Sequence, residues 1–298
     1  MNRRTFLSGF AGCAGLLLAG CTPRGNRVSI GTKNFTEQLI LGEMLAQLVE
    51  ARGLPVERRF YLAGSYICQQ AILAGRIDTY VEYTGTALMA ILKEPPESNP
   101  AEVFETVKHE YAERFNLEVL PSLGFNNTFA IVMRSDDASR NNVKTLSDLS
   151  RMAPHMRMGV GYEFLERKDG FAGLAQTYDL HFAEPPRVMD LGLLYRALES
   201  KQVDVVVGSN TDGLIVALGL VVLEDDRHYF PPYDAVPVVR PAALQRWLIL
   251  RDVLQGLAGK ISADEMRRLN FAVDGQKKDA TVVVRNFLRS RGLLQMGG

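Results

Sequence analysis

Short apolar runs alternate with longer amphipathic stretches along most of the chain, which is the pattern of proteins that alternate strands and helices. The first part of this pattern predicts strands at residues 28–31, 56–61 and 77–81, with helices between them. Asn34 and Glu37 have the spacing of a capping box, so the first helix should begin with Asn34 as its cap. The hydrophobic pattern therefore indicates the α/β class.

The same order of features returns about 126 residues later in the chain. Tyr83 corresponds to Ser209 at an offset of 126, and Gly31 corresponds to Gly159 at an offset of 128. Two such echoes in the same order indicate two similar α/β lobes.

Two extended apolar runs, at residues 128–134 and 233–240, are typical of strands that cross between lobes. Three amphipathic stretches after the second run predict helices at residues 242–257, 263–273 and 279–291. A discontinuous first lobe and a cleft that opens and closes follow from this order. The expected bounds are residues 28–128 and 231–298 for the first lobe and residues 129–230 for the second.

The first 21 residues have the features of an export signal. Arg3 and Arg4 precede an apolar stretch at residues 10–20, which is too short for a bilayer span of about 20 residues. The segment ends in Leu-Ala-Gly before Cys21 and resembles the bacterial lipobox, whose cysteine is lipidated and becomes the mature N-terminus. Its Arg-Arg-Thr-Phe-Leu run also resembles a twin-arginine signal, which leaves the export route open.

We therefore expect residues 1–21 to be a signal peptide and lipidation site, with the mature protein held by its lipid at the periplasmic or outer face of the cytoplasmic membrane. The alternatives are an uncleaved anchor and a buried N-terminal helix.

Charge and cysteine content exclude several classes of protein. The 298-residue chain has 34 Lys and Arg and 34 Asp and Glu, whereas nucleic-acid binding requires a basic excess. Loss of Cys13 with the signal leaves Cys21 and Cys68, so no disulfide framework is expected, and Cys68 should be a small buried hydrophobe. We expect a monomer that is stabilised by packing.

The loops at the carboxyl ends of the predicted strands carry the candidate chemistry, because ligands of open α/β sheets bind there. These loops and the two crossings offer aromatic rings, two cations and hydroxyl groups at Lys33, Tyr83, Thr86, Phe129, Tyr162, Arg167, Ser209 and Tyr233. Aromatic faces attract a quaternary ammonium by roughly 0.5–2 kcal/mol each. Lys, Arg and a helix N-terminus attract a carboxylate. A small zwitterion with a methylated ammonium and a carboxylate would satisfy both sets.

Six ordered motifs resemble the glycine betaine/choline/carnitine (osmoprotectant) substrate-binding proteins of ABC importers. They are GTKNFTE at 31–37, EYTGT at 82–86, GFNNTFA at 124–130, EFLER at 163–167, TDG at 211–213 and FPPYD at 230–234. The resemblance implies a two-lobed type II periplasmic-binding-protein fold with two crossing hinge strands. It also implies delivery of the ligand to a membrane permease that a cytoplasmic ATPase drives, without a cofactor and without catalysis.

The resemblance assigns roles to individual positions. Tyr83 and Tyr233 match aromatic cage residues, and Phe129 stands where a cage Tyr is frequent. The carboxylate-binding set is matched by Lys33, Thr86 and Arg167. We expect the cage on one lobe and the anion site on the other, so that a ligand that contacts both favours closure.

Ser209 stands where an aromatic cage residue is common in the family. Either Tyr66 or Tyr162 replaces this wall, or the ligand is bulkier or less methylated than glycine betaine. Carnitine, a choline ester and a histidine-derived betaine of the ergothioneine type would fit a wider pocket. Asn127 is a further candidate for contact with the ligand, and these alternatives stay open.

Two rival functions remain. An enzyme is disfavoured because the four histidines, at residues 109, 155, 181 and 228, are scattered without metal-ligand spacing, so no metal site is expected. A sensory module with the same fold would pass its ligand state to a receptor rather than to a permease.

Overall fold

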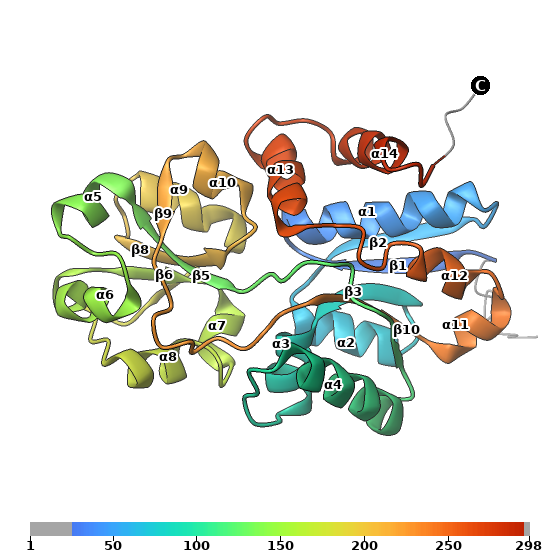
Figure 1. Ribbon diagram of the computed structural model, residues 1–298, viewed down its shortest axis with the longest axis horizontal. Coiled ribbons are helices and arrows are strands. Elements are labelled where there is room, and N and C mark those ends of the chain that lie inside the picture. The colour runs from blue at the N-terminus through green and yellow to red at the C-terminus, as the bar shows by residue number, and fades with distance from the viewer. Residues whose placement is uncertain (1–25, 295–298) are drawn as a thin grey trace, which may run out of the picture.

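Residues 26–294, which the computed structural model describes, form two lobes, each built on one five-stranded mixed sheet (Figure 1). The sheet of the first lobe has the strand order β2-β1-β3-β10-β4, with β1 Val28–Lys33, β2 Val56–Ala63, β3 Thr79–Tyr83, β4 Glu118–Val119 and β10 Ala235–Val239. The sheet of the second lobe has the order β7-β6-β8-β5-β9, with β5 Phe129–Arg134, β6 Met158–Val160, β7 Arg187–Val188, β8 Val205–Ser209 and β9 Leu220–Val222. The expected α/β class and the two lobes are confirmed.

The two sheets share one topology. In each sheet, an inner strand pairs in parallel with the strands on both sides of it, and the strand that follows a crossing runs antiparallel to its neighbours. The strands β3 and β8 hold equivalent places and lie 126 positions apart, so Tyr83 and Ser209 end equivalent strands. The internal echo in the sequence is therefore confirmed as a structural repeat.

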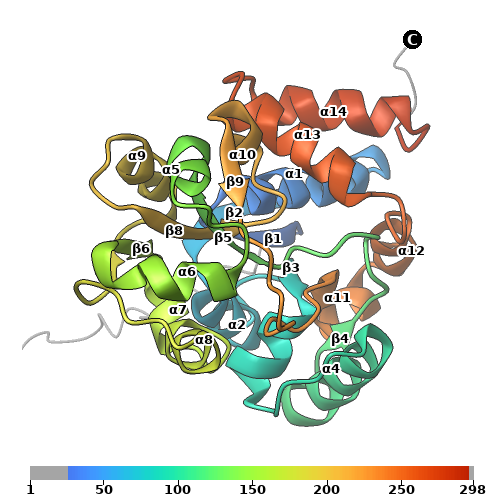
Figure 2. The same cartoon turned by 60° about the vertical axis from the view of Figure 1, so that its left-hand side comes forward.

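Helices pack on both faces of each sheet (Figures 1 and 2). The first lobe carries α1 Thr36–Ala51, α2 Ser65–Leu73, α3 Thr84–Thr86, α4 Pro100–Phe115, α11 Pro241–Arg246, α12 Leu250–Gln255, α13 Ala263–Asp274 and α14 Ala280–Ser290. The second lobe carries α5 Ser135–Arg140, α6 Leu146–Met152, α7 Tyr162–Glu166, α8 Phe171–Tyr178, α9 Leu194–Glu199 and α10 Gly213–Ala217. A π-helix at Ala87–Leu92 follows α3.

The helix α1 begins without the expected cap. Its N-cap residue is Phe35, whose side chain makes no capping hydrogen bond, so the prediction of an Asn34 capping box was wrong. The physical reason is that the Glu37 carboxylate is buried and accepts hydrogen bonds from other segments of the chain. Ser262 and Glu265, which have the same spacing, do form a capping box at the start of α13.

Two crossings join the lobes and pair with each other (green and orange in Figure 1). The first passes through Asn127 into β5, and the second passes through Tyr233 into β10. The Asn127 N–H donates to the Tyr233 carbonyl at 2.9 Å, and Asn126 forms a β-bridge with Asp234. Each lobe keeps its own hydrophobic clusters, so a few extended residues in the crossings can absorb a rotation of one lobe against the other.

Two further expectations, and one observation on helix length, concern the ends and the interior of the chain. The predicted signal peptide and lipidation site, at residues 1–21, fall outside the described residues. Within residues 26–294, no helix combines the length and the apolar character that crossing a bilayer requires. Cys68 is fully buried, as expected, and burial raises the pKa of its thiol to about 12.

Candidate functional site

A cavity of about 1060 Å³ lies between the lobes, at the carboxyl ends of β1, β3, β6 and β8. All ten side chains that we predicted from the sequence line it: Lys33, Tyr66, Tyr83, Thr86, Asn127, Phe129, Tyr162, Arg167, Ser209 and Tyr233. They come from both lobes and from both crossings. The fold therefore brings the predicted residues to one place, while their contact with a ligand stays a prediction.

On the first lobe, a ring and a cation lie together. The Lys33 ammonium is 4.5 Å from the centroid of the Tyr83 ring and forms an ion pair with the buried Glu82 carboxylate. Phe35 stacks against Tyr83, with ring centroids 6.4 Å apart and an angle of 22° between the ring planes. The charge of Lys33 is thus balanced inside the protein by an acid that sequence reasoning missed.

On the second lobe, Arg167 has similar surroundings. Its Nε donates to Oδ1 of Asp169 at 2.8 Å, and its Nη1 donates across the cleft to Oγ1 of Thr86 at 3.0 Å. The guanidinium carbon lies 5.0 Å from the centroid of the Phe129 ring and 5.8 Å from that of the Tyr233 ring. Burial alone would lower the pKa of Arg167, but Asp169 raises it above its ordinary value, so the guanidinium stays charged.

The aromatic rings beside Arg167 pack against one another. Phe129 meets Tyr233 edge to face at a centroid distance of 5.5 Å and meets Phe164 in the same way at 5.0 Å. The Tyr233 hydroxyl donates to Oδ2 of Asp169 at 2.6 Å, and burial together with this carboxylate raises the pKa of Tyr233 well above its ordinary value. The hydroxyl is therefore a fixed donor, and the ring orientation depends on Asp169.

Rings and cations are not separated by lobe, contrary to the prediction of a cage on one lobe and an anion site on the other. Lys33 and Tyr83 both stand at strand ends of the first lobe, whereas Arg167 and Phe129 both belong to the second. A buried cation needs an acid or an aromatic face to replace its lost hydration. Tyr83 and Phe129 therefore each have a cation of their own lobe beside them.

Ser209, the predicted substitute for an aromatic cage residue, lies at the cavity. Ser209 is the register partner of Phe129 in the β5–β8 ladder and lines the cavity with a small side chain. Tyr162 is 64% exposed and stands at the rim, and the Lys93 ammonium lies 5.3 Å from the ring centroid of Tyr66. The choice between a replaced wall and a wider pocket stays open.

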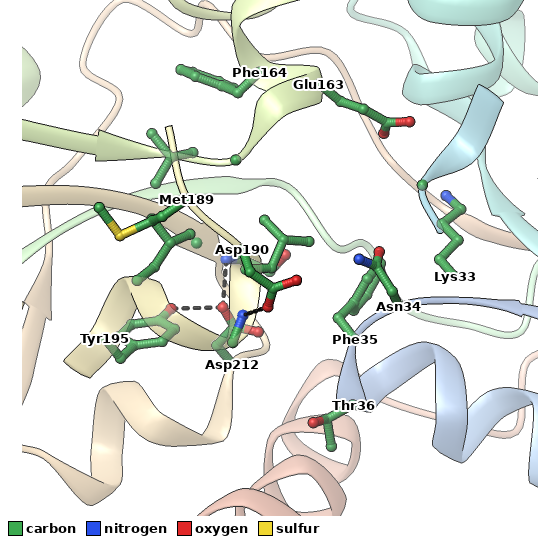
Figure 3. Close-up of a pocket in the computed structure, with 18 of the residues that line it drawn as sticks. Lys33, Asn34, Phe35, Thr36, Glu163, Phe164, Met189, Asp190, Tyr195 and Asp212 are labelled. Carbon is green, nitrogen blue, oxygen red and sulfur yellow. Dashed lines mark hydrogen bonds between the residues drawn. The ribbon is translucent and has the colours of Figure 1, made fainter. Parts of the chain in front are cut away.

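Sequence reasoning missed the acidic part of the cavity wall. Asp212 accepts hydrogen bonds from the Tyr195 hydroxyl at 2.6 Å and from the Ser209 N–H at 2.8 Å (Figure 3). Burial raises the pKa of Asp212 to about 6. Asp190 and Glu163 also extend into the cavity in Figure 3. A signal for Asp212 was present, because an Asp three residues after a strand end commonly accepts a backbone N–H.

Tyr61 is a second missed residue of the wall. The β1–β2 register changes between the pairs Gly31–Arg59 and Lys33–Ala63. At this irregularity Tyr61 adopts a left-handed φ of 61° and is 60% exposed toward the cavity. Tyr61 lies at an irregularity between two paired strands, and a bulge within a strand has no reliable sequence signal.

The side chains of residues 26–294 contain no group of three His, Cys, Asp or Glu that could hold a metal ion.

The chain matches the model of one protein family, described as the substrate binding domain of an ABC-type glycine betaine transport system, over residues 26–290. It is 36% identical over 265 residues to the ergothioneine transport permease/ergothioneine binding protein of Helicobacter pylori (strain G27), which covers 89% of this chain. The chain spans only 47% of the length of that relative.

Two other relatives match over nearly their whole length. The carnitine transport binding protein of Listeria monocytogenes serotype 1/2a (strain 10403S) is 34% identical over 291 residues, which are 94% of each chain. A crystal structure of a glycine betaine/carnitine/choline ABC transporter is 33% identical, with a TM-score of 0.73, and covers 90% of this chain and 100% of that one. The resemblance seen in the six motifs is thereby confirmed: this chain belongs to the family of substrate-binding domains of ABC-type glycine betaine transport systems.

Proposed function

We propose that this chain is the extracytoplasmic substrate-binding protein of an ABC importer and that it captures a small quaternary ammonium compound between its lobes. The observation that carries the proposal is the convergence of three rings, Tyr83, Phe129 and Tyr233, and two cations, Lys33 and Arg167, on one cavity. Rings attract a methylated ammonium, and cations attract a carboxylate. Family membership supports delivery of the captured ligand to a permease in the membrane.

Both cations already have partners in the protein. Lys33 pairs with Glu82, and Arg167 pairs with Asp169. A ligand carboxylate therefore competes with these acids for the two cations. A zwitterion offsets this competition. Its carboxylate attracts Lys33 and Arg167 away from the ring faces, and its methylated ammonium then occupies the positions that these cations held at the rings. Thr86, which contacts Arg167, would help to orient the carboxylate.

A bulkier betaine is the second candidate ligand. The volume of about 1060 Å³ slightly exceeds the roughly 300–1,000 Å³ that small-molecule pockets enclose. Ser209 leaves one wall without a ring. Carnitine and ergothioneine appear in the names of two relatives that are 34% and 36% identical.

The remaining features of the proposal concern the whole protein. The lobes divide at residues 28–128, 129–230 and 231–298, which the start of β5 at Phe129 and the pairing of β10 with β3 support. The mature protein is a monomer, binds its ligand without chemical conversion, and is anchored through lipidated Cys21. The lipobox-like residues before Cys21 support the anchor.

A thermal-shift screen tests the ligand class. Glycine betaine, proline betaine, choline, carnitine and ergothioneine are added separately to the protein, with unmethylated glycine as the control solute. A compound that binds only the folded state raises the unfolding midpoint by mass action. At least one of the five should do so while glycine does not. Equal midpoints for all five and glycine would refute the proposal.

The anchor has its own test. Cys21→Ser should move the protein from the membrane fraction to the soluble fraction of fractionated cells. Retention of the variant in the membrane fraction would contradict lipidation at this residue.

A further inference from the structure

Glu37 is a buried carboxyl group at the place where both lobes and a crossing meet. It lies in the first turn of α1, and its residue is 2% exposed. Four side chains from four separate segments donate hydrogen bonds to it: Tyr83 on β3, Asn127 in the first crossing, Thr211 after β8 and Asn270 on α13. Four donors around one fully buried carboxylate are more than a structural cap requires.

The two carboxylate oxygens of Glu37 accept hydrogen bonds from different parts of the protein. Oε1 accepts from the Tyr83 hydroxyl at 2.6 Å and from Nδ2 of Asn127 at 2.7 Å, and both of these donors line the ligand cavity. Oε2 accepts from the Thr211 hydroxyl of the second lobe and from Nδ2 of Asn270 at 3.1 Å. One carboxylate thus links the cavity wall to a contact between lobes.

The contact between the lobes at Thr211 is tight. Nδ2 of Asn270 also donates to the Thr211 carbonyl at 2.9 Å. The helix α10 of the second lobe lies beside α13 of the first (Figure 2), and a Cβ placed on Gly213 would lie 2.3 Å from the backbone nitrogen of Phe271. The loop that contains Thr211 therefore forms a close contact between the second lobe and α13 of the first.

We propose that Glu37 is a positioning residue for ligand capture, which fixes Tyr83 and Asn127 at the cavity with one oxygen and docks the Thr211 loop of the second lobe with the other as the cleft closes. This inference rests on the proposed function. Closure buries the carboxyl, and opening removes Thr211 and admits water. The state of Glu37 and the state of the cleft are therefore linked.

Burial, partly offset by the hydrogen bonds from Thr211, Tyr83 and Asn270, raises the pKa of Glu37 to about 7. Opening hydrates the carboxyl and moves this pKa back toward its ordinary value of 4.5. At any pH between these two pKa values, closure is therefore accompanied by the uptake of a proton by Glu37. Protonation thus favours the closed form as pH falls toward 4.5, and this stabilisation is lost as pH rises through 7.

Other titratable groups face Glu37 from the elements packed around it. The charge of Asp212, which follows β8, raises the pKa of Glu37 further. Asp274 on α13 is itself shifted upward in pKa by burial, and Tyr83 on β3 stays protonated. Lys33, at the end of β1, lies over the Tyr83 ring and pairs with Glu82. A variant of Glu37 is needed to separate its titration from theirs.

The first experiment measures affinity against pH. Glycine betaine, carnitine and ergothioneine are each titrated by calorimetry at about pH 5.5 and about pH 8 into the wild-type protein and into Glu37→Gln. The wild-type protein should bind about tenfold more tightly at the lower pH, and Glu37→Gln should lose this dependence. Glu43→Gln is the matched control, because Glu43 is buried on the same helix but pairs with Arg58 and should keep the wild-type profile. The same pH profile in Glu37→Gln and the wild-type protein would overturn the proposal.

The second experiment uses no ligand. The Glu37 carboxyl carbon is titrated by NMR in the ligand-free wild-type protein and in Tyr83→Phe, because Tyr83 and Glu37 belong to the same lobe and their contact does not depend on closure. Loss of the hydroxyl donor, which favours the charged form, should raise the pKa of Glu37 in the variant. An unchanged titration would mean that Glu37 does not hold the Tyr83 hydroxyl in solution and would overturn the proposal. If none of the three compounds binds, the proposed function fails, while this titration still decides the role of Glu37.

Discussion

The Arg167 guanidinium and the Asp169 carboxylate form a two-bond ion pair in which the side chains are only 4% and 1% exposed. Each charge replaces hydration that the other lost on burial, so neither can be removed without leaving its partner uncompensated. The cavity therefore depends on Asp169 as well as on Arg167, although the sequence pointed only to the latter.

Arg167→Ala should destabilise the folded protein by about 3–5 kcal/mol, because it leaves the Asp169 charge buried without its partner. Urea denaturation measures the free energy of unfolding. Arg196→Ala is the control, since Arg196 lines the same cavity with an exposed side chain. Equal losses in the two variants would show that burial of the ion pair has no special cost.

Tyr233→Ala should weaken the binding of a methylated ammonium by about 1–2 kcal/mol, because one aromatic face is lost. Tyr233→Phe keeps the ring and removes only the hydroxyl that donates to Asp169. Calorimetry with the compound that gives the largest thermal shift should therefore show a smaller loss for Phe than for Ala. If the two variants lose the same affinity, the hydroxyl and not the ring is responsible.

The fold was predictable because its signals are local and repeated. Alternation of apolar runs and amphipathic stretches predicted the strands β1, β2 and β3, and the offset of 126 between Tyr83 and Ser209 predicted a second, similar sheet. Boundaries were less certain: the helix expected at residues 242–257 is split into α11 and α12 around the buried Trp247. A break of this kind is decided by packing against distant segments, which the sequence does not display.

The site was predictable where a residue matches a family motif and either ends a strand, as Tyr83 does, or follows one closely, as Arg167 follows β6 and the short helix α7. Its compensating acids were not. Glu82 is next to Tyr83 in sequence, but its partner Lys33 is 49 residues away, and a charged residue in a strand is ordinarily exposed. Glu37 was misread for the same reason, since a local capping pattern concealed donors that lie as far away as Asn270.

Gly64→Ala should weaken ligand binding by about fivefold, the equivalent of about 1 kcal/mol. A Cβ at this position would lie 2.2 Å from Oε1 of Glu163, the atom that accepts the Tyr66 N–H across the cleft at 3.3 Å. The substitution therefore displaces the Glu163 carboxylate, which is the flexible end of its side chain, and removes its contact with the Tyr66 N–H. Calorimetry on Gly64→Ala, on Glu163→Ala and on the double variant checks this, because all three lack the same contact and should bind with equal affinity. A double variant that binds clearly more weakly than either single variant would contradict it.

Asp212 should make stability depend on pH. Its folded-state pKa of about 6 is above its ordinary value of 3.8, so folding favours the protonated carboxyl. The stabilisation is complete below about pH 3.8 and is lost as pH rises through about 6, by up to about 3 kcal/mol. Urea denaturation of wild-type protein and of Asp212→Asn should show the wild-type protein losing stability relative to the variant across this range. A constant difference between them would refute the shift.

Ser209→Phe should change the preference among ligands. The new ring would stand opposite Phe129 in the β5–β8 ladder and would supply the wall that Ser209 leaves open. We expect glycine betaine to bind more tightly by about 0.5–2 kcal/mol, the value of one further aromatic face, while ergothioneine and carnitine bind more weakly because the cavity is smaller. Calorimetry with the three compounds measures this ratio, and Ser209→Ala, which removes the hydroxyl without adding a ring, should leave it unchanged. If Ser209→Phe weakens all three ligands equally, the side chain at this position blocks the cavity instead of forming a wall of the cage, and the width of the pocket does not select the ligand.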